Sequence, residues 1–343
     1  MSTTVVTLGE IMLRLKSPGF ERLLQSPTLE ATFGGGEANV AVSLAGFGFD
    51  VRFVSAVPAN PVGDACVAEL RRRGVDPRFV ARRGERLGVY YLEAGAVQRP
   101  SRVIYDRSGS AIATAGTGDI DLTGAFEGAD WFHITGITPA LSESAAELSL
   151  KAARLAGERG LSVSCDLNYR KKLWKYGKAP QEVMTQIMPH VDVAVGNEED
   201  YQKSLGVQLD ADVSSGRLDR DAYAAMAQRV LETYPRLRVV AVTLRESRSA
   251  SHNGWSAMLA TREEVLFSRH YEITHIVDRV GAGDSFAAGL IYGLRALGNH
   301  ADALEFAVAA SCLKHTIPGD VALLSVPEVQ ALAGGDASGR VQR

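Results

Sequence analysis

An aspartate follows a Gly-Ala-Gly turn in the segment VDRVGAGDSFAAGLIYGL, residues 277–294. Apolar residues recur at helical spacing after it, so we expect a helix whose first turn contains Asp284. The backbone amides of Gly281, Ala282 and Gly283 would then lie at the positive end of that helix, where a phosphate group binds well. The carboxylate of Asp284 could either cap the helix or accept a proton.

A second glycine-rich stretch, FGGGEANVAVSLAGFG, occupies residues 33–48. Gly34, Gly35 and Gly36 allow close approach to the backbone, and the apolar residues after them predict a helix. This pattern alone also fits a turn and helix without function. Neither a G-x-G-x-x-G fingerprint nor a P-loop occurs at these positions, so we expect any nucleotide to be held in another way.

Composition narrows the class of protein. The chain has 343 residues, of which 46% are hydrophobic, enough for a large core in one big domain or two. The net charge of −3 gives no basic field for nucleic acid or an acidic membrane surface. Three cysteines without CxxC spacing argue against disulfides and zinc. With no leader or long apolar span, we expect a cytoplasmic protein that binds small molecules.

Short β-rich runs alternate with helical patterns along the chain. The runs expected to be buried strands lie at 5–8, 51–56, 131–136, 161–167, 191–196 and 239–244. This alternation predicts an α/β fold with a mostly parallel sheet covered by helices on both faces, and with ligands at the carboxyl ends of its strands. One helix, at about 144–160, is expected to begin with a capping box of Ser144 and Glu147.

Two stretches, residues 10–33 and 87–115, lack helical periodicity. The second resembles two strands joined by a polar loop that contains Gly95 and Pro100. We expect a small β-sheet that is inserted into the α/β body and serves as a lid. The chain would then form one domain over residues 1–332, followed by a disordered tail at 333–343.

The two glycine elements, in this order, resemble the ribokinase-like, or PfkB, family of carbohydrate kinases. The resemblance runs from about Val5 to about Leu332, and its most specific part is DRVGAGDSFAAG. It implies ATP and Mg²⁺ as cofactors. It further implies that Asp284 is the general base, and that the amides of residues 281–284 form an anion hole for the phosphoryl group in transfer.

The family holds Mg²⁺ through an Asn-x-x-Glu motif, for which this chain has GNEEDYQ, with Asn197, Glu199 and Asp200. Aspartate at the last position is one methylene shorter than glutamate, so the resemblance implies an indirect hold on the metal by Asp200 or Glu199. A solvated acidic loop is the alternative. Arg279 also departs from the family, which has a small hydroxyl residue there; it could touch nucleotide phosphates or only the surface.

Two arginines indicate an acidic substrate. Tyr105 and Arg107 are two residues apart on an expected strand and so share a face, whereas Asp106 points away. Arg170 follows the strand that ends near Leu167, at the edge where ligands bind. Guanidinium groups match carboxylates in a bidentate way, although an exposed surface charge is the alternative for each arginine.

The segments YDRSGSA, DLNYRKKLW, GITPALS and KHTIPGD together resemble the 2-keto-3-deoxygluconate kinase branch of the family. The resemblance implies a sugar-acid site formed by Gly34, Gly35, Gly36, Asn39, Tyr90, Tyr105, Arg107, Arg170 and Asp284. It implies an ATP site formed by Asn168, Arg170, Asn197, Thr243, Arg245, Gly281 and Gly283.

We therefore expect an ATP-dependent kinase that phosphorylates the 6-hydroxyl of 2-keto-3-deoxygluconate. A fructokinase or another sugar kinase on the same scaffold is the first alternative, and a sugar-binding regulator without turnover is the second. Alternating apolar residues in the small sheet cannot all be buried by one thin layer, which predicts a homodimer through this sheet and leaves a higher homo-oligomer open.

Overall fold

The computed structural model describes residues 3–209, 219–336 and 338–339. Its larger sheet has eleven strands among these residues: β1 (Thr4–Leu8), β4 (Asp50–Val57), β5 (Val75–Asp76), β6 (Val80–Arg82), β9 (Trp131–Thr135), β10 (Ser162–Asp166), β11 (Val193–Gly196), β12 (Val239–Ser247), β13 (Asn253–Ala260), β14 (Val265–Phe267) and β15 (Tyr271–Ile273). The spatial order is β14-β13-β12-β11-β10-β9-β1-β4-β5, with β15 beside β13 and β6 beside β4.

The strands from β12 to β5 in this order run parallel, and β13 pairs antiparallel with β12, β14 and β15. All six strands predicted from the sequence are present, which confirms the mostly parallel sheet. Both faces of the sheet are buried: Val5 and Val6, which are neighbours on β1, are each 0% exposed and belong to opposite cores. Parallel strands that are apolar on both faces require helices on both sides.

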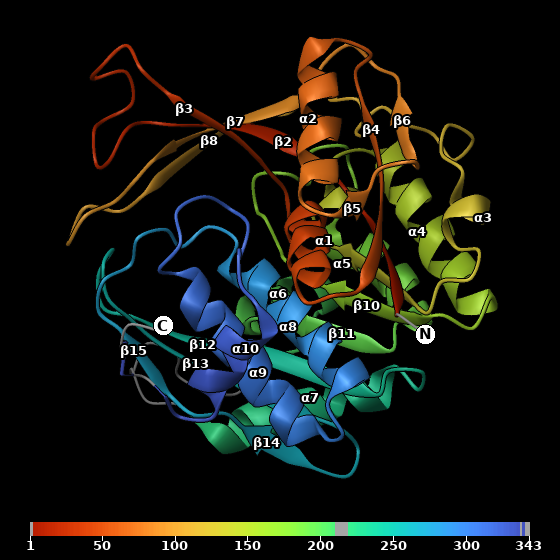
Figure 1. Ribbon diagram of the computed structural model, residues 1–343. Helices are drawn as coiled ribbons and strands as arrows, with labels where there is room; N and C mark the ends of the chain where they lie inside the picture. The colour runs from red at the N-terminus through yellow and green to blue at the C-terminus, as the bar shows by residue number, and fades with distance from the viewer. Residues whose placement is uncertain (1–2, 210–218, 337, 340–343) are drawn as a thin grey trace.

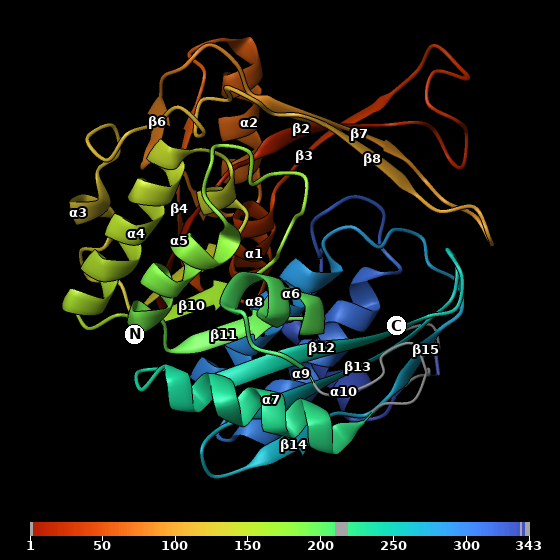
Figure 2. The ribbon, with the colours of Figure 1, turned by 180° about the vertical axis from the view of Figure 1, so that it is seen from behind.

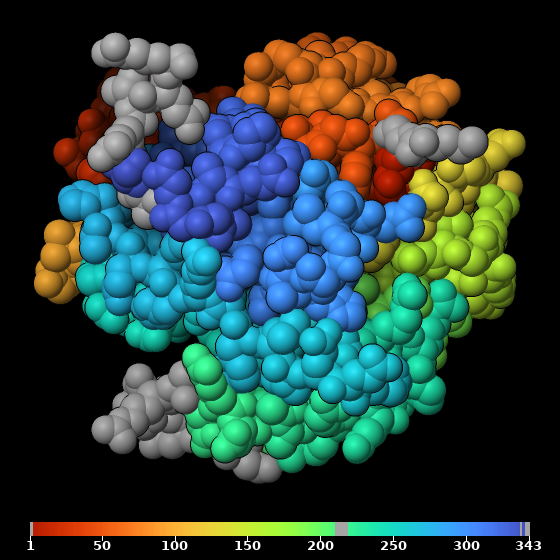
Figure 3. Space-filling model, turned by 60° about the horizontal axis from the view of Figure 1, so that its bottom comes forward, coloured from red at the N-terminus to blue at the C-terminus, as the bar shows by residue number. Residues whose placement is uncertain are grey.

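Helices cover the two faces of the larger sheet (Figures 1 and 2). One core contains residues of α1 (Gly36–Gly46), α2 (Pro61–Arg72), α8 (Ala282–Ala296), α9 (His300–Lys314) and α10 (Val326–Ala333). The other contains residues of α3 (Leu122–Ala125), α4 (Glu143–Glu158), α5 (Pro180–Ile187), α6 (Glu198–Leu205) and α7 (Arg220–Thr233), with the short 3₁₀ helices η1 (Thr138–Ala140) and η2 (Met188–His190) beside them. Figure 3 shows the C-terminal part of the chain, in blue, over the middle of one side of the molecule.

The expected capping box of Ser144 and Glu147 is wrong. Helix α4 begins after Ser142, whose extended backbone lets its Oγ accept a hydrogen bond from the amide of Ala145 at 3.1 Å. Ser144 already lies in the first helical turn, and its hydroxyl donates to the carbonyl of Ala113 at 3.1 Å. Ser142 is followed at the third position by Ala145, so the helix has a serine N-cap without the reciprocal glutamate of a capping box.

A second, separate sheet has the order β3-β2-β7-β8 and projects away from the larger one (Figure 1). Its strands are β2 (Met12–Lys16), β3 (Glu30–Gly34), β7 (Gly88–Glu93) and β8 (Arg102–Asp106). Strand β2 pairs in parallel with β7, and the outer pairs are antiparallel. The chain leaves this sheet after Asp106, and Ala111, Ile112 and Ala115 pack in the core of the larger body.

The last helix of the described chain, α10, ends at Ala333. The predicted disordered tail at 333–343 falls partly on residues 337 and 340–343, which lie outside the described residues. Over the part of the chain that the structure describes, no helix combines the length and the apolar character needed to cross a membrane.

Candidate active site

A cavity of about 500 Å³ opens at the carboxyl ends of the parallel strands. Glu10 follows β1, Asp166 ends β10, and Asn197 follows β11, and all three line the cavity. The first turn of α8 forms another part of the wall, and β7 and β8 of the small sheet contribute Tyr90 and further residues. The cavity therefore lies where the sheet topology predicts a ligand site.

Asp284 joins the two glycine-rich elements. The Nδ2 atom of Asn39 donates a hydrogen bond of 2.7 Å to Oδ2 of Asp284, across 245 positions of sequence. Asp284 is the third residue of α8, and the helix begins after Gly281 with no side-chain cap. The carboxylate lines the cavity and does not cap its own helix.

Burial raises the pKa of Asp284 to about 6, against the opposing hydrogen bond from Asn39. The charge of Asp320 raises the pKa further, whereas the positive charges of Arg170 and Lys314 lower it. A carboxylate with a pKa near 6 is ionised at neutral pH and is a better proton acceptor than an ordinary aspartate.

The glycines around Asp284 and Asp320 differ in how much room each has for a side chain. Gly281 has a φ of 83°, and a Cβ atom there would overlap the backbone carbonyl oxygen of Asp320. A Cβ atom at Gly283 would meet nothing within 4 Å, and Gly283 lines the cavity. A Cβ atom at Gly34 would overlap the carboxylate of Asp320. Gly34 therefore packs behind the wall instead of lining the cavity.

Arg107 lies in the wall as part of an ion pair. It is 7% exposed, and its Nε donates a hydrogen bond of 2.7 Å to Oε2 of Glu10. Its guanidinium carbon also lies 5.4 Å from the ring centre of Tyr105. The two residues share a face as predicted, although β8 ends at Asp106, which pairs instead with Arg86 at 2.9 Å. No local sequence pattern indicates that Arg107 has an internal carboxylate partner.

Asp320 is a wall residue that the sequence analysis missed. It is 4% exposed, and the hydroxyl of Tyr90 lies 2.6 Å from each of its carboxylate oxygens. Arg14, on β2, forms ion pairs with both Asp320 and Asp278. The segment KHTIPGD contains Asp320, but a single aspartate in a loop has no local pattern that indicates a site.

The opposite wall has polar side chains suited to a nucleotide. Thr243, Arg245 and Ser247 alternate along β12 and all line the cavity. Arg279 also lines it, and its Nη2 donates to the carbonyl oxygen of Ala250 at 2.7 Å. Arg279 thus links the turn before α8 to the β12–β13 connection.

Asn168 and Arg170 follow β10 at the same edge. Asn168 has a φ of 36°, an uncommon backbone conformation for a residue with a side chain. Its amide donates to Oδ1 of Asp166 at 3.1 Å, while its own Oδ1 is buried without a hydrogen-bond partner among the described residues. Arg170 is exposed and donates to the carbonyl of Tyr169 at 2.9 Å.

Asp200 is bound to the protein backbone through both carboxylate oxygens. Oδ2 accepts from the amide of Asn197 at 2.9 Å and Oδ1 from the amide of Tyr169 at 2.8 Å. Asn197 accepts in return from the amide of Asp200, so the pair is the capping box of α6. The shorter side chain thus caps a helix at the edge of the cavity.

The acidic wall fits a hydrated divalent cation. Asp166, Glu199 and Asp200 line the cavity, and burial followed by the charges of Asp200 and Asp284 raises the pKa of Asp166 well above its ordinary value. Within the described residues no three acidic, histidine or cysteine side chains are arranged as direct ligands. Mg²⁺ commonly keeps several waters, so this wall fits an outer-sphere site better than a closed protein cage.

The structure brings nearly all of the predicted site residues to one cavity. Those that line it are Gly35, Gly36, Asn39, Tyr90, Tyr105, Arg107, Asn168, Arg170, Asn197, Glu199, Asp200, Thr243, Arg245, Gly281, Ala282, Gly283 and Asp284. Gly34 lies behind the wall, for the packing reason given above. Glu10 and Asp320 also line the cavity but were not predicted, because only contacts with residues distant in sequence connect them to the site.

A fold of this topology with this site defines a class of sugar-phosphorylating proteins, and comparison with known families agrees. The pfkB family carbohydrate kinase model matches residues 2–325. The chain therefore belongs to the pfkB family of carbohydrate kinases, which confirms the resemblance and the ribokinase-like fold.

Three relatives illustrate the similarity. A 2-dehydro-3-deoxygalactonokinase of Haloferax volcanii is 34% identical over 98% of this chain and 99% of its own. A 2-dehydro-3-deoxygluconokinase of Thermoproteus tenax is 30% identical over 94% and 92%. A crystal structure of 2-dehydro-3-deoxygluconokinase from Thermotoga maritima is 48% identical, covers 97% of this chain and 100% of its own, and superimposes with a TM-score of 0.92.

Proposed function

We propose that this protein transfers the γ-phosphoryl group of ATP to the 6-hydroxyl of 2-keto-3-deoxygluconate, also called 2-dehydro-3-deoxygluconate. The observation that carries the proposal is the buried carboxylate of Asp284, which faces the cavity from the first turn of α8 with Asn39 fixing one of its oxygens. A general base beside a helix N-terminus is the arrangement that phosphoryl transfer to an alcohol requires.

In this reaction, the hydroxyl of the sugar lies next to Asp284, which accepts its proton as the oxygen attacks phosphorus. The amides of Gly281, Ala282 and Gly283 face the oxygens of the transferred group, and the positive end of α8 stabilises their charge. Mg²⁺, when bound, neutralises charge on the phosphate oxygens. Asp166, Glu199 and Asp200 would hold it through water, and Arg245 and Thr243 line the nucleotide side.

Two features favour a sugar acid over a neutral sugar. Arg107 and Arg170 line the cavity together with the phenols of Tyr90 and Tyr105, which gives guanidinium and hydroxyl donors for a carboxylate. The named relatives also act on deoxy-keto sugar acids. Because Glu10 already pairs with Arg107, the carboxylate of the substrate would join an existing ion pair instead of meeting an isolated cation.

The galactonate epimer is a second candidate substrate, favoured by the 34% identity to the Haloferax volcanii enzyme. The two sugar acids differ in configuration at one hydroxyl-bearing carbon. A fructokinase fits less well because a neutral ketose has no carboxylate for the arginines. A regulator without turnover is the least favoured, since Asp284 and its anion-binding turn are both in place.

The test is an ADP-release assay with purified protein, ATP and Mg²⁺ against 2-keto-3-deoxygluconate, its galactonate epimer, fructose and ribose. The proposal expects the highest kcat/KM with a deoxy-keto sugar acid, and a product whose phosphorus NMR coupling places the phosphate on carbon 6. A higher kcat/KM with fructose would contradict the proposal and support the fructokinase alternative. ADP release with none of these compounds, together with sugar binding, would favour a regulator.

We also propose a homodimer formed through the small sheet. Ile104 on β8 is 54% exposed and Val97 in the β7–β8 connection is 54% exposed. Leu24, between β2 and β3, is 77% exposed. Three large apolar side chains on this thin sheet and its connections favour a partner that covers them, and a second copy of the same surface could do so by symmetry.

A further inference from the structure

We propose that Arg14 is a positioning residue that aligns the sugar wall and the anion-binding turn of the same site. It would do so by holding Asp320, which lines the sugar side, and Asp278, which begins the turn before α8. The proposal rests on the function proposed above and adds to it a residue that contacts neither substrate.

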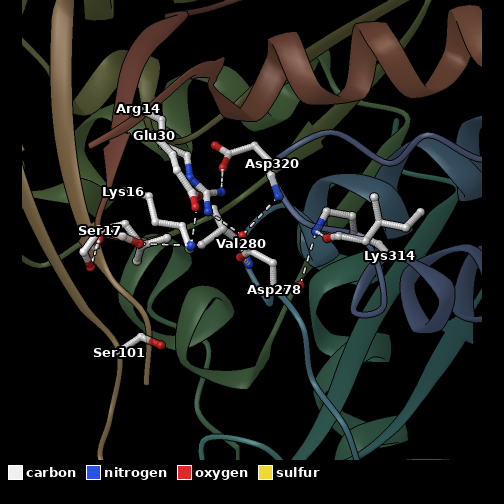
Figure 4. A network of polar contacts seen from close by, with 12 residues as sticks. Arg14, Lys16, Ser17, Glu30, Ser101, Asp278, Val280, Lys314 and Asp320 are labelled. Atoms are coloured by element: carbon white, nitrogen blue, oxygen red, sulfur yellow. Dashed lines mark hydrogen bonds and ion pairs between the residues drawn. The ribbon is translucent and has the colours of Figure 1, made fainter. Parts of the chain in front are cut away.

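Arg14 reaches both carboxylates from the small sheet. It lies on β2 and is 2% exposed. Its Nη1 donates to Oδ1 of Asp320 and its Nη2 donates to Oδ2 of Asp278, residues 306 and 264 positions away in sequence. Figure 4 shows the guanidinium between the two aspartates, with Lys314 reaching Asp278 from the other side. One planar fork therefore fixes the spacing of two separate loops.

The sugar side of this network is Asp320. Its carboxylate receives Arg14 and the hydroxyl of Tyr90, and it packs directly against the backbone at Gly34. The same residue presents its backbone carbonyl to Gly281. Because the donors and the close packing hold the carboxylate in one orientation, Asp320 can offer a fixed acceptor to a hydroxyl of the substrate.

The phosphoryl side of the network is Asp278. Its Oδ1 accepts from the amide of Val280 at 3.1 Å, and its Oδ2 accepts from the amide of Gly319 at 3.2 Å. Its backbone carbonyl accepts from Nζ of Lys314, also at 3.2 Å. Asp278 thus ties the turn at 278–281 to the loop that contains Asp320, and Arg14 completes that connection from the small sheet.

Electrostatics explain why an arginine is needed at position 14. Asp278 is 7% exposed and Asp320 4%, so each carboxylate is largely removed from water. Among the described residues, Arg14 is the ion-pair partner of both. Burial raises the pKa of Asp320, and attraction to Arg14 is the largest opposing influence. Loss of the guanidinium would leave like charges facing each other and would favour protonation of Asp320.

Lysine is the informative substitution because Arg14→Lys keeps the charge and loses the fork. A single ammonium on a shorter side chain cannot hold both carboxylates in their present positions. We expect KM for the sugar acid to rise roughly tenfold through Asp320, and kcat to fall roughly tenfold through Asp278, the size of effect that loss of a charge-assisted hydrogen bond gives. The dissociation constant of ATP, measured by calorimetry, should stay within about twofold of wild type.

A double-mutant comparison separates positioning from general damage to the fold. Asp320→Asn should raise KM, and adding Arg14→Lys should raise it no further, because Arg14 acts on KM through Asp320. The loss of kcat caused by Arg14→Lys should persist in the double variant. All rates are divided by the folded fraction from circular dichroism. Arg22→Lys, which alters the ion pair between the exposed Arg22, in the β2–β3 connection, and Glu93 of β7, is the matched control and should match wild type.

Two results would overturn the inference. One is an Arg14→Lys variant with a lower melting temperature but wild-type KM and kcat per folded molecule, which would make the network purely structural. The other is a double variant in which the KM increases of Arg14→Lys and Asp320→Asn multiply, because Arg14 would then not act through Asp320. The wild-type protein tests the proposed function separately. If it phosphorylates no sugar acid, that function is wrong, whatever the variants show.

Discussion

Asn39 and Asp284 are bonded to each other at 2.7 Å, although 245 positions of sequence separate them. Each belongs to a glycine-rich segment that begins a helix, α1 and α8, and these two helices pack against each other in one core. The bond fixes one oxygen of the proposed base and leaves the carboxylate facing the cavity. Two motifs that are each ambiguous alone thus define one site once their side chains meet.

Asp284→Asn should abolish most of the catalysis and leave the fold intact. The amide cannot accept the proton of the hydroxyl, so kcat should fall by roughly 10²- to 10⁴-fold, the usual contribution of a positioned general base. The affinity for ATP should change little, which isothermal calorimetry can measure. A variant with near wild-type kcat would show that Asp284 has a structural role instead.

The same substitution should stabilise the protein at neutral pH. The pKa of Asp284 is raised to about 6 in the fold, so ionisation above that pH opposes folding, whereas below its unfolded pKa of about 4 the group is protonated in both states. Removing the charge should therefore add up to about 3 kcal/mol to the free energy of unfolding at pH 8, and less at pH 5.

Urea unfolding of wild type and variant at both pH values measures this difference. Asp50→Asn, which alters an exposed aspartate at the start of β4, is the control and should show no comparable gain. Equal stability of Asp284→Asn and wild type at pH 8 would contradict the raised pKa.

Arg107→Met should impair the sugar acid more than a neutral sugar. Loss of one charge-assisted bond costs about 1.5–3 kcal/mol, so KM for 2-keto-3-deoxygluconate should rise roughly 10- to 150-fold with much of kcat kept. Because the change also leaves Glu10 without its buried partner, the double variant Glu10→Gln with Arg107→Met is the control for that unpaired charge. Equal loss for sugar acid and fructose would make Arg107 a residue that merely holds the small sheet.

Arg170→Met should lower kcat as well as raise KM. This side chain is exposed at the cavity edge, and its charge acts on Asp166, Asp200 and Asp284 together. Its removal should therefore weaken both the substrate and the charge balance around the transferred group. Steady-state kinetics that show a change in KM alone would restrict Arg170 to binding.

The small sheet should form a homodimer. Light scattering at micromolar concentration should give twice the 36.7 kDa of one chain, or a higher even multiple. Ile104→Glu should shift the mass toward one chain by placing a charge in the interface. Val62→Glu, at an exposed apolar site on α2, should leave the mass unchanged. A wild-type mass of a single chain would exclude this assembly.

The sequence was most informative where function depends on local geometry. The Gly-Ala-Gly turn, the helix after it and the strand ends that carry Asn168 and Asn197 follow from periodicity and turn chemistry over a few residues. Their common cavity follows from a parallel sheet, because its strands all end at one edge. The fold and most of the site were predictable for that reason.

The sequence was least informative where a side chain acts through distant contacts. Glu10, Arg14 and Asp320 stand alone in their segments, and their partners lie between 97 and 306 positions away. Asp200 lines the cavity where its motif predicts, but the two backbone amides that its oxygens accept are brought together only by the folded chain. Such roles depend on tertiary proximity, which no short pattern encodes.

The contact between Arg14 and Asp320 has a consequence for the protein while it is being synthesised. Almost the whole chain must leave the ribosome before the guanidinium of the second strand can meet its counter-charges. Until then, the nascent polypeptide carries a guanidinium without either of the two carboxylates that it meets in the folded protein. The positioning that we propose for Arg14 can therefore arise only near the end of translation.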